Sequence, residues 1–244
     1  AFETDEAVAI IAEPMQAEGG ERHVSDRFFV RLRALASAYG VPFIVDEVQC
    51  GFGLGGPFFW HFRFPLTEAP DVVTIAKKAM VGGILSRHPI GVEQEVHVAS
   101  AVRGLCQADI IDNADIEPME ADVRRRLQAL HKAHPKTVLA PRCEGYSFGF
   151  DLPGKEAVAH LIGQRLWRGW MLYGAGSTAV RFRLHPHVSA RSIDAMFDRL
   201  DASLTHLESG EAPTWQKVDM PDPLGKAARK AVLADGITLE RLDA

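Results

Sequence analysis

The stretch Val41-Pro42-Phe43-Ile44-Val45-Asp46-Glu47-Val48-Gln49 decides the fold. Its first five residues are apolar, which is typical of a strand buried on both faces, and the run ends at Asp46. Ala7–Ala12 upstream and Asp71–Ile75 downstream are further strand-like runs. The three runs therefore predict neighbouring strands of one sheet.

A helix is predicted between the first two strands. Ser25 is a suitable N-cap and Gly40 a suitable end. Apolar residues recur at helical spacing between them, at Phe28, Phe29, Leu32, Leu35 and Ala36. Strand, helix and strand at these lengths indicate a parallel sheet with crossover helices.

The second half of the chain alternates short strands with helices and predicts a smaller domain. Strands are expected over 137–140, 146–152, 171–173 and 179–184. Helices are expected over 93–105, 118–134 and 190–207, around Val158 to Trp167, and over 224–234. The predicted fold class is α/β, a mostly parallel sheet with flanking helices, plus a smaller α+β C-terminal domain. The expected division is 1–114 for the larger domain, 115–208 for the smaller one, and 209–244 for a tail of unassigned role.

Two polar residues close apolar strands and suggest a chemistry. Asp46 ends one strand, and Lys78 follows the strand that ends at Ile75. Ligands of parallel sheets bind beyond the carboxyl ends of the strands. A lysine forms an imine with an aldehyde cofactor, and an aspartate keeps the ring nitrogen of that cofactor protonated, as pyridoxal phosphate requires. The alternative is that Asp46 caps a turn and Lys78 is a solvated surface lysine.

The composition is that of an ordinary globular protein. The 244 residues carry a net charge of −5, which gives no reason to expect nucleic acid or a membrane surface as a partner. No apolar run is long enough to span a membrane. The three cysteines are dispersed, which favours a reducing, cytoplasmic compartment, and the histidines lack the further ligands of a metal site.

The loop Gly51–Gly56 matches G-x-G-x-x-G, and Asp71 lies 20 positions after Gly51. This spacing resembles a dinucleotide-binding fingerprint, which requires a helix to open at the third glycine. Pro57-Phe58-Phe59-Trp60 follows instead. The sequence therefore favours a flexible turn over a dinucleotide site.

Four motifs occur in the order found in one enzyme family. They are Glu13-Pro14-Met15-Gln16-Ala17-Glu18-Gly19-Gly20, Asp46-Glu47-Val48-Gln49-Cys50-Gly51, Lys77-Lys78-Ala79-Met80-Val81-Gly82-Gly83 and Val180-Arg181-Phe182-Arg183. Over about residues 5 to 207 the chain resembles the class III aminotransferases, in the subgroup of 4-aminobutyrate and lysine ε-aminotransferases. The resemblance implies the type I fold of pyridoxal-phosphate enzymes, with only part of the large domain present, and a homodimer.

The resemblance assigns cofactor-binding roles residue by residue. Lys78 is the Schiff-base lysine, chosen over Lys77 because the family has a small residue four positions after it, and Gly82 satisfies this. Asp46 pairs with the pyridinium nitrogen. Gln49 bonds the phenolic oxygen of the ring, or is a surface amide. Glu13 is expected to support Asp46.

The resemblance also assigns a substrate-binding pair. Glu18 masks Arg181 while an ω-amine occupies the site and releases it to bind the carboxylate of 2-oxoglutarate. An arginine suits this role because its planar guanidinium meets a carboxylate in bidentate fashion. The choice of Arg181 over Arg183 rests on the family pattern, and the alternative for Arg181 is a structural ion pair.

The expected function is a pyridoxal-phosphate-dependent ω-aminotransferase that moves a terminal amino group from a lysine- or 4-aminobutyrate-like donor to 2-oxoglutarate. Two alternatives stay open: a non-catalytic or degenerate module of the same fold, and a mutase using the same cofactor. Family chains are nearly twice as long, and the turn that holds the cofactor phosphate has no counterpart here. Between Gly83 and Ala101 the chain is also shorter than the family, and Cys50 replaces the usual threonine.

Overall fold

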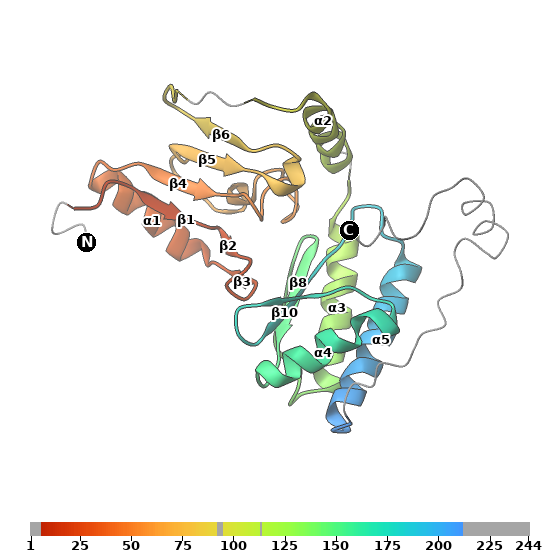
Figure 1. Ribbon diagram of the computed structural model, residues 1–244. Coiled ribbons are helices and arrows are strands. Elements are labelled where there is room, and N and C mark those ends of the chain that lie inside the picture. Colours follow the sequence, from red (N-terminus) through yellow and green to blue (C-terminus); the bar gives the residue numbers. More distant parts are fainter. Residues whose placement is uncertain (1–5, 92–94, 113, 212–244) are drawn as a thin grey trace, which may run out of the picture. The chain divides into compact units, whose positions relative to one another are not determined.

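The computed structural model describes residues 6–91, 95–112 and 114–211 (Figure 1). The chain divides into a compact unit of residues 1–213 and a second unit of residues 214–244. The second unit lies outside the described residues, as does the helix expected over 224–234. The first unit contains two four-stranded sheets and a two-stranded hairpin.

The N-terminal sheet is mostly parallel, as predicted. Its spatial order is β1 (Ile10–Ala12), β4 (Phe43–Asp46), β5 (Val72–Ile75) and β6 (Gly83–Ser86). The first three strands are parallel, and β6 is antiparallel to β5. β1 is shorter than the predicted run because its pairing with β4 begins only at Ile10. The sequence did not predict β6, whose apolar core is only two residues long.

Helix α1 (Asp26–Ala38) packs on this sheet as expected. The Ser25 side chain caps it by accepting a hydrogen bond from the Phe28 backbone N–H. Phe29 and Ala36 are fully buried in a cluster with Phe43 of β4. This cluster is the core under the N-terminal sheet.

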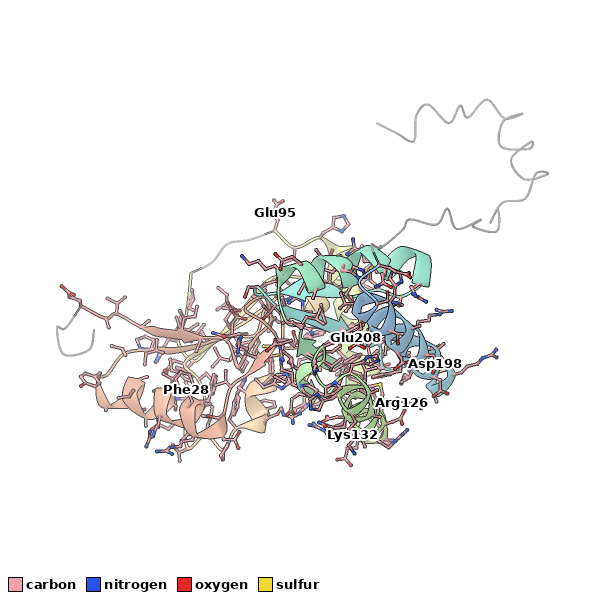
Figure 2. The ribbon with its side chains drawn as sticks, turned by 90° about the horizontal axis from the view of Figure 1, so that it is seen from below. Phe28, Glu95, Arg126, Lys132, Asp198 and Glu208 are labelled. Carbon is pink, nitrogen blue, oxygen red and sulfur yellow. The ribbon has the colours of Figure 1, made fainter. Side chains whose placement is uncertain are left out.

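The predicted apolar stripe of α1 is wrong at two positions. Phe28 (Figure 2) and Leu35 are exposed, by 53% and 42%. Arg33 is buried in their place, and its Nη1 donates to Asp71 Oδ2 at 2.6 Å. An ion pair across to the start of β5 therefore decides which side of the helix faces inward, and apolar spacing alone does not show it.

The segment after β4 forms turns and no α-helix at Gly56. A short 3-10 helix, η2 (Trp60–Arg63), follows, which agrees with rejecting the dinucleotide fingerprint. A second 3-10 helix, η3 (Lys77–Ala79), follows β5. Helix α2 (Val98–Asp112) packs against η3.

The C-terminal sheet is antiparallel. Its order is β7 (Leu139–Glu144), β8 (Ser147–Asp151), β10 (Ala179–Arg183) and β9 (Tyr173–Ala175). Its apolar residues share one core with α3 (Glu117–Ala133), α4 (Lys155–Arg168) and α5 (Ala190–Glu208), coloured green to blue in Figure 1. The α+β character of this half is therefore confirmed, whereas the exact domain limits 1–114 and 115–208 stay predictions.

A short hairpin precedes α1. It consists of β2 (Met15–Gln16) and β3 (Arg22–His23), and the sequence did not predict it. Its turn carries Glu18 and Glu21. The backbone N–H of Gly176, which precedes β10, donates to the Glu18 carbonyl at 2.7 Å. The hairpin turn is thus fastened to the C-terminal sheet.

Gly145 is a position where only glycine fits. It lies between β7 and β8 with φ of +58°, and a Cβ there would lie 2.4 Å from the Leu54 carbonyl oxygen. We expect Gly145→Ala to lower the free energy of unfolding by roughly 2–5 kcal/mol, since backbone strain and overpacking add. Urea denaturation measures this change.

Gly40 supplies the matched control. Its φ is +63°, but nothing lies within 4 Å of a Cβ built there. Gly40→Ala should therefore lower the free energy of unfolding only by the strain of a left-handed alanine, about 1–2 kcal/mol. Equal losses in the two variants would show that the Leu54 contact relaxes without cost.

Candidate active site

Asp46 lies at the carboxyl end of β4, beside Thr74 of β5. Its Oδ1 accepts hydrogen bonds from Thr74 Oγ1 and from the Val48 backbone N–H, both at 3.0 Å. Within the described residues its Oδ2 has no hydrogen bond. One carboxylate oxygen is thus fixed by the protein, and the other is available to a ligand.

Glu13 lies elsewhere than the sequence suggested. It is exposed, and its Oε2 accepts from the Ala17 backbone N–H at 3.4 Å. No hydrogen bond joins Glu13 to Asp46 in the described part of the chain. Thr74 supports Asp46 instead. The parallel register, which pairs Asp46 with Thr74 of the neighbouring strand, is the signal that identifies Thr74.

Lys78 lies in η3, on the turn that follows β5. Residues on either side of it, Lys77 and Met80, have left-handed backbone with φ of 50° and 62°. Ala79 is buried, and Gly104 of α2 lies directly against its carbonyl oxygen. A Cβ added at Gly104 would lie only 2.5 Å from that oxygen, so α2 packs closely on the turn. The turn that carries Lys78 is thus held by packing.

The amine of Lys78 is suited to reaction as a nucleophile. Burial, and then the nearby positive charge of Arg183, lower its pKa to about 8. Its Nζ lies 5.6 Å from the centroid of the Tyr146 ring. Among the described residues it makes no hydrogen bond or ion pair. A larger share of this amine is therefore neutral near pH 7 than of an ordinary lysine.

Tyr146 comes from the connection between β7 and β8 and is only 2% exposed. Its backbone N–H donates to Leu54, and its carbonyl accepts from the Leu184 N–H, both at 2.8 Å. These bonds fasten it to the glycine-rich loop after β4 and to the end of β10. No local sequence pattern identifies Tyr146, because its contact with Lys78 joins residues far apart in the chain.

Lys77 has different surroundings from Lys78. It is exposed, and its Nζ donates to Gln49 Oε1 at 2.9 Å. The Gln49 Nε2 in turn donates to Glu18 Oε1 at 3.0 Å. These contacts favour Lys78 as the reactive lysine. The predicted bond from Gln49 to a cofactor ring stays a prediction, and one Nε2 hydrogen remains for it.

Glu18 and Arg181 are brought together as predicted. Arg181 lies in β10, is 7% exposed, and donates from Nη2 to Glu18 Oε1. Its Nη1 is buried without a hydrogen-bond partner within the described residues. The side chain of Glu18 is 69% exposed, and hydrogen bonds from Arg181 and Gln49 lower its pKa. A buried guanidinium is thus paired with a carboxylate that is largely exposed to solvent.

Arg183 serves a structural purpose. Both of its Nη atoms donate to Glu21, a fully buried carboxylate whose pKa is raised by burial. Because Arg183 is fully committed to this ion pair, Arg181 is the better candidate to bind a substrate carboxylate. Glu21, at the turn of the β2–β3 hairpin, was missed by sequence reasoning.

Residues 1–108 match the family model described as aminotransferase class-III. This part of the chain is identified as a class III aminotransferase. The chain is 32% identical over 224 residues to L-lysine-epsilon aminotransferase of Mycobacterium tuberculosis, and 33% identical over 186 residues to mitochondrial 4-aminobutyrate aminotransferase of Mus musculus. These matches cover 84% and 71% of the chain.

Solved structures agree. Lysine aminotransferase from M. tuberculosis in the internal aldimine form has a TM-score of 0.75 and 28% identity, over 85% of this chain and 52% of that one. Ornithine aminotransferase from Plasmodium yoelii, at 18% identity and a TM-score of 0.72, shares the fold. The chain spans 49% of the mycobacterial relative and 37% of the mouse one, about half their length or less.

Class III aminotransferases depend on pyridoxal phosphate, and the residues of this chain fit that group. Lys78 offers an amine of lowered pKa with no hydrogen-bond partner among the described residues. Asp46 offers a carboxylate with one oxygen fixed and one open. These are the two groups that an aldehyde and a ring nitrogen need.

Two kinds of feature are absent from the described part of the chain. None of its helices is long and apolar enough to cross a membrane. It also contains no group of three or more histidine, cysteine or acidic side chains placed to hold a metal ion.

Proposed function

We propose that this aminotransferase is an ω-aminotransferase, moving a terminal amino group from a lysine- or 4-aminobutyrate-like donor to 2-oxoglutarate. The observation that carries the proposal is the pairing of buried Arg181 with exposed Glu18. The names of the relatives, lysine ε- and 4-aminobutyrate aminotransferases, support the same substrate class.

The chain would hold the cofactor through two side chains at the strand ends. When bound, pyridoxal phosphate supplies an electron sink for the bond cleaved at the substrate carbon. Lys78 would hold the cofactor aldehyde through its amine and would act as the general base that moves a proton at the substrate carbon. Asp46 keeps a proton on the ring nitrogen, with its Oδ1 oriented by Thr74 and Val48.

Arg181 and Glu18 account for two substrates in one site. While Glu18 neutralises Arg181, an amine without a nearby carboxylate is accepted. When Glu18 turns toward solvent, the guanidinium is exposed to a keto acid. Nη1, which has no hydrogen-bond partner among the described residues, is then one of two donors for a bidentate carboxylate.

This proposal predicts opposite effects of two substitutions. Arg181→Ala should slow the 2-oxoglutarate half-reaction by at least about a hundredfold, because two charge-assisted hydrogen bonds are lost. The amine half-reaction does not need the guanidinium and should change severalfold at most. Glu18→Ala should shift the preference from ω-amines toward glutamate. Single-turnover mixing, followed by cofactor absorbance, measures each half-reaction separately.

Equal effects of Arg181→Ala on both half-reactions would contradict the switch and return Arg181 to a structural ion pair. A protein that acquires no cofactor absorbance after loading would favour the non-catalytic alternative. Turnover of a single substrate without an acceptor would favour the mutase. The homodimer and the cytoplasmic location stay predictions from the sequence.

A further inference from the structure

Lys77, Gln49, Glu18 and Arg181 form a continuous polar chain. Lys77 Nζ donates to Gln49 Oε1 at 2.9 Å, and Gln49 Nε2 donates to Glu18 Oε1 at 3.0 Å. Arg181 donates to the same Glu18 oxygen. This row of hydrogen-bonded side chains connects the turn that carries the two lysines, after β5, to strand β10.

The orientation of the Gln49 amide depends on Lys77. An ammonium group only donates, so the Gln49 carbonyl oxygen must face Lys77 and its NH₂ group must face Glu18. A flipped amide would place its carbonyl against the Glu18 carboxylate, which only accepts, and its NH₂ group against an ammonium. Lys77 and Glu18 therefore favour the same amide orientation, and Lys77 holds the Gln49 side chain from its carbonyl end.

The backbone at Lys77 supports a specific role for this side chain. Its φ of 50° is left-handed, which is unfavourable for a residue with a Cβ. Lys77 is exposed, so burial of its side chain does not explain the conformation. This turn directs Lys77 to Gln49 and Lys78 to the ring of Tyr146.

We propose that Lys77 is a positioning residue that, through Gln49, sets how firmly Glu18 holds Arg181. The inference rests on the proposed function, because it gives Lys77 control of the balance between amine and dicarboxylate substrates. Lys77 touches neither substrate in this scheme. It acts by fixing one of the two donors that keep Glu18 on Arg181.

The direction in which removal of Lys77 changes dianion binding separates this positioning role from simple charge attraction. Removing a cation near the site weakens the binding of a dianion by lost attraction. Loosening Glu18 has the opposite effect, because Arg181 becomes easier to release. Measurements at about 0.5 M salt reduce the first effect, since exposed charges are then screened over a few ångströms.

The test compares Lys77→Met with Lys77→Arg in the protein without cofactor. The methionine variant lacks the donor, and the arginine variant keeps it. Lys77 also lowers the pKa of Glu18 by direct attraction, so the titration is made at about 0.5 M salt, where that attraction is screened. The pKa of Glu18 in Lys77→Met, followed by NMR titration of its carboxyl carbon, should still rise there. The dissociation constant of glutarate, measured by calorimetry, should fall by about three- to tenfold, the equivalent of one hydrogen bond. Lys77→Arg should match the wild type in both.

An unchanged Glu18 pKa in Lys77→Met would overturn the proposal, and so would weaker glutarate binding at high salt. Failure to rescue by Lys77→Arg would do the same. If the wild-type protein binds no glutarate, the proposed function fails, and the Glu18 titration at about 0.5 M salt decides the role of Lys77. In the loaded enzyme, the expected change is in KM for 2-oxoglutarate, with kcat within about twofold, because the bond acts on binding.

Discussion

Lys78→Ala should abolish covalent attachment of pyridoxal phosphate and all transamination. The substitution removes the Lys78 amine and leaves a methyl group. Among the described residues, this is the only amine at the strand ends that makes no competing hydrogen bond. Lys77 does not substitute for it, because Lys77 Nζ is exposed and bonded to Gln49. Borohydride reduction of the loaded protein, followed by peptide mapping, identifies the attached lysine.

Lys77→Ala is the matched control and should retain the attachment at Lys78. A cofactor label found on Lys77 would reverse the assignment of the two lysines.

The pH dependence of attachment gives a second criterion. A neutral amine is the nucleophile, and the pKa of Lys78 is lowered to about 8. The rate of attachment should therefore rise with pH and level off above about pH 8, whereas an ordinary lysine levels off above about pH 10.4. Stopped-flow absorbance measures this rate.

The sequence predicted the parallel sheet and the positions of Asp46 and Lys78 for one physical reason. An apolar run that is buried on both faces is legible in the sequence, and the polar residue that ends it lies at the edge where ligands bind. The resemblance to a family added Glu18, Gln49 and Arg181. The structure brings these three side chains into one hydrogen-bonded chain.

The features that the sequence did not predict depend on contacts between distant residues. Tyr146 reaches Lys78 because the β7–β8 connection is bonded to Leu54 and Leu184, and no local pattern encodes this. Burial of Arg33 on α1 likewise depends on Asp71, 38 positions away. The support for Asp46 likewise comes from another strand, because Thr74 donates to it, whereas the Glu13 carboxylate accepts from the Ala17 N–H.

Asp46→Asn should preserve the fold but lower turnover by about 10²–10³-fold, comparable to the loss of one major electrostatic stabiliser. The substitution keeps the shape and the hydrogen bond that Asp46 Oδ1 accepts from the Val48 N–H. It removes the negative charge that favours a protonated ring nitrogen, so charge developing on the substrate carbon is less well stabilised. Steady-state turnover and the cofactor absorbance spectrum measure the two consequences.

Thr74→Val separates the charge of Asp46 from its orientation. This variant removes the 3.0 Å hydrogen bond to Asp46 Oδ1 but leaves the carboxylate charged. Its expected cost is about fivefold, the effect of one neutral-donor hydrogen bond. If Asp46→Asn lost no more than Thr74→Val, the charge of Asp46 would not act on the ring nitrogen, and its role would be to cap the turn after β4. A loss far larger than that of Thr74→Val, with unchanged urea denaturation, places the effect in the chemical step and ties the end of β4 to the reacting group.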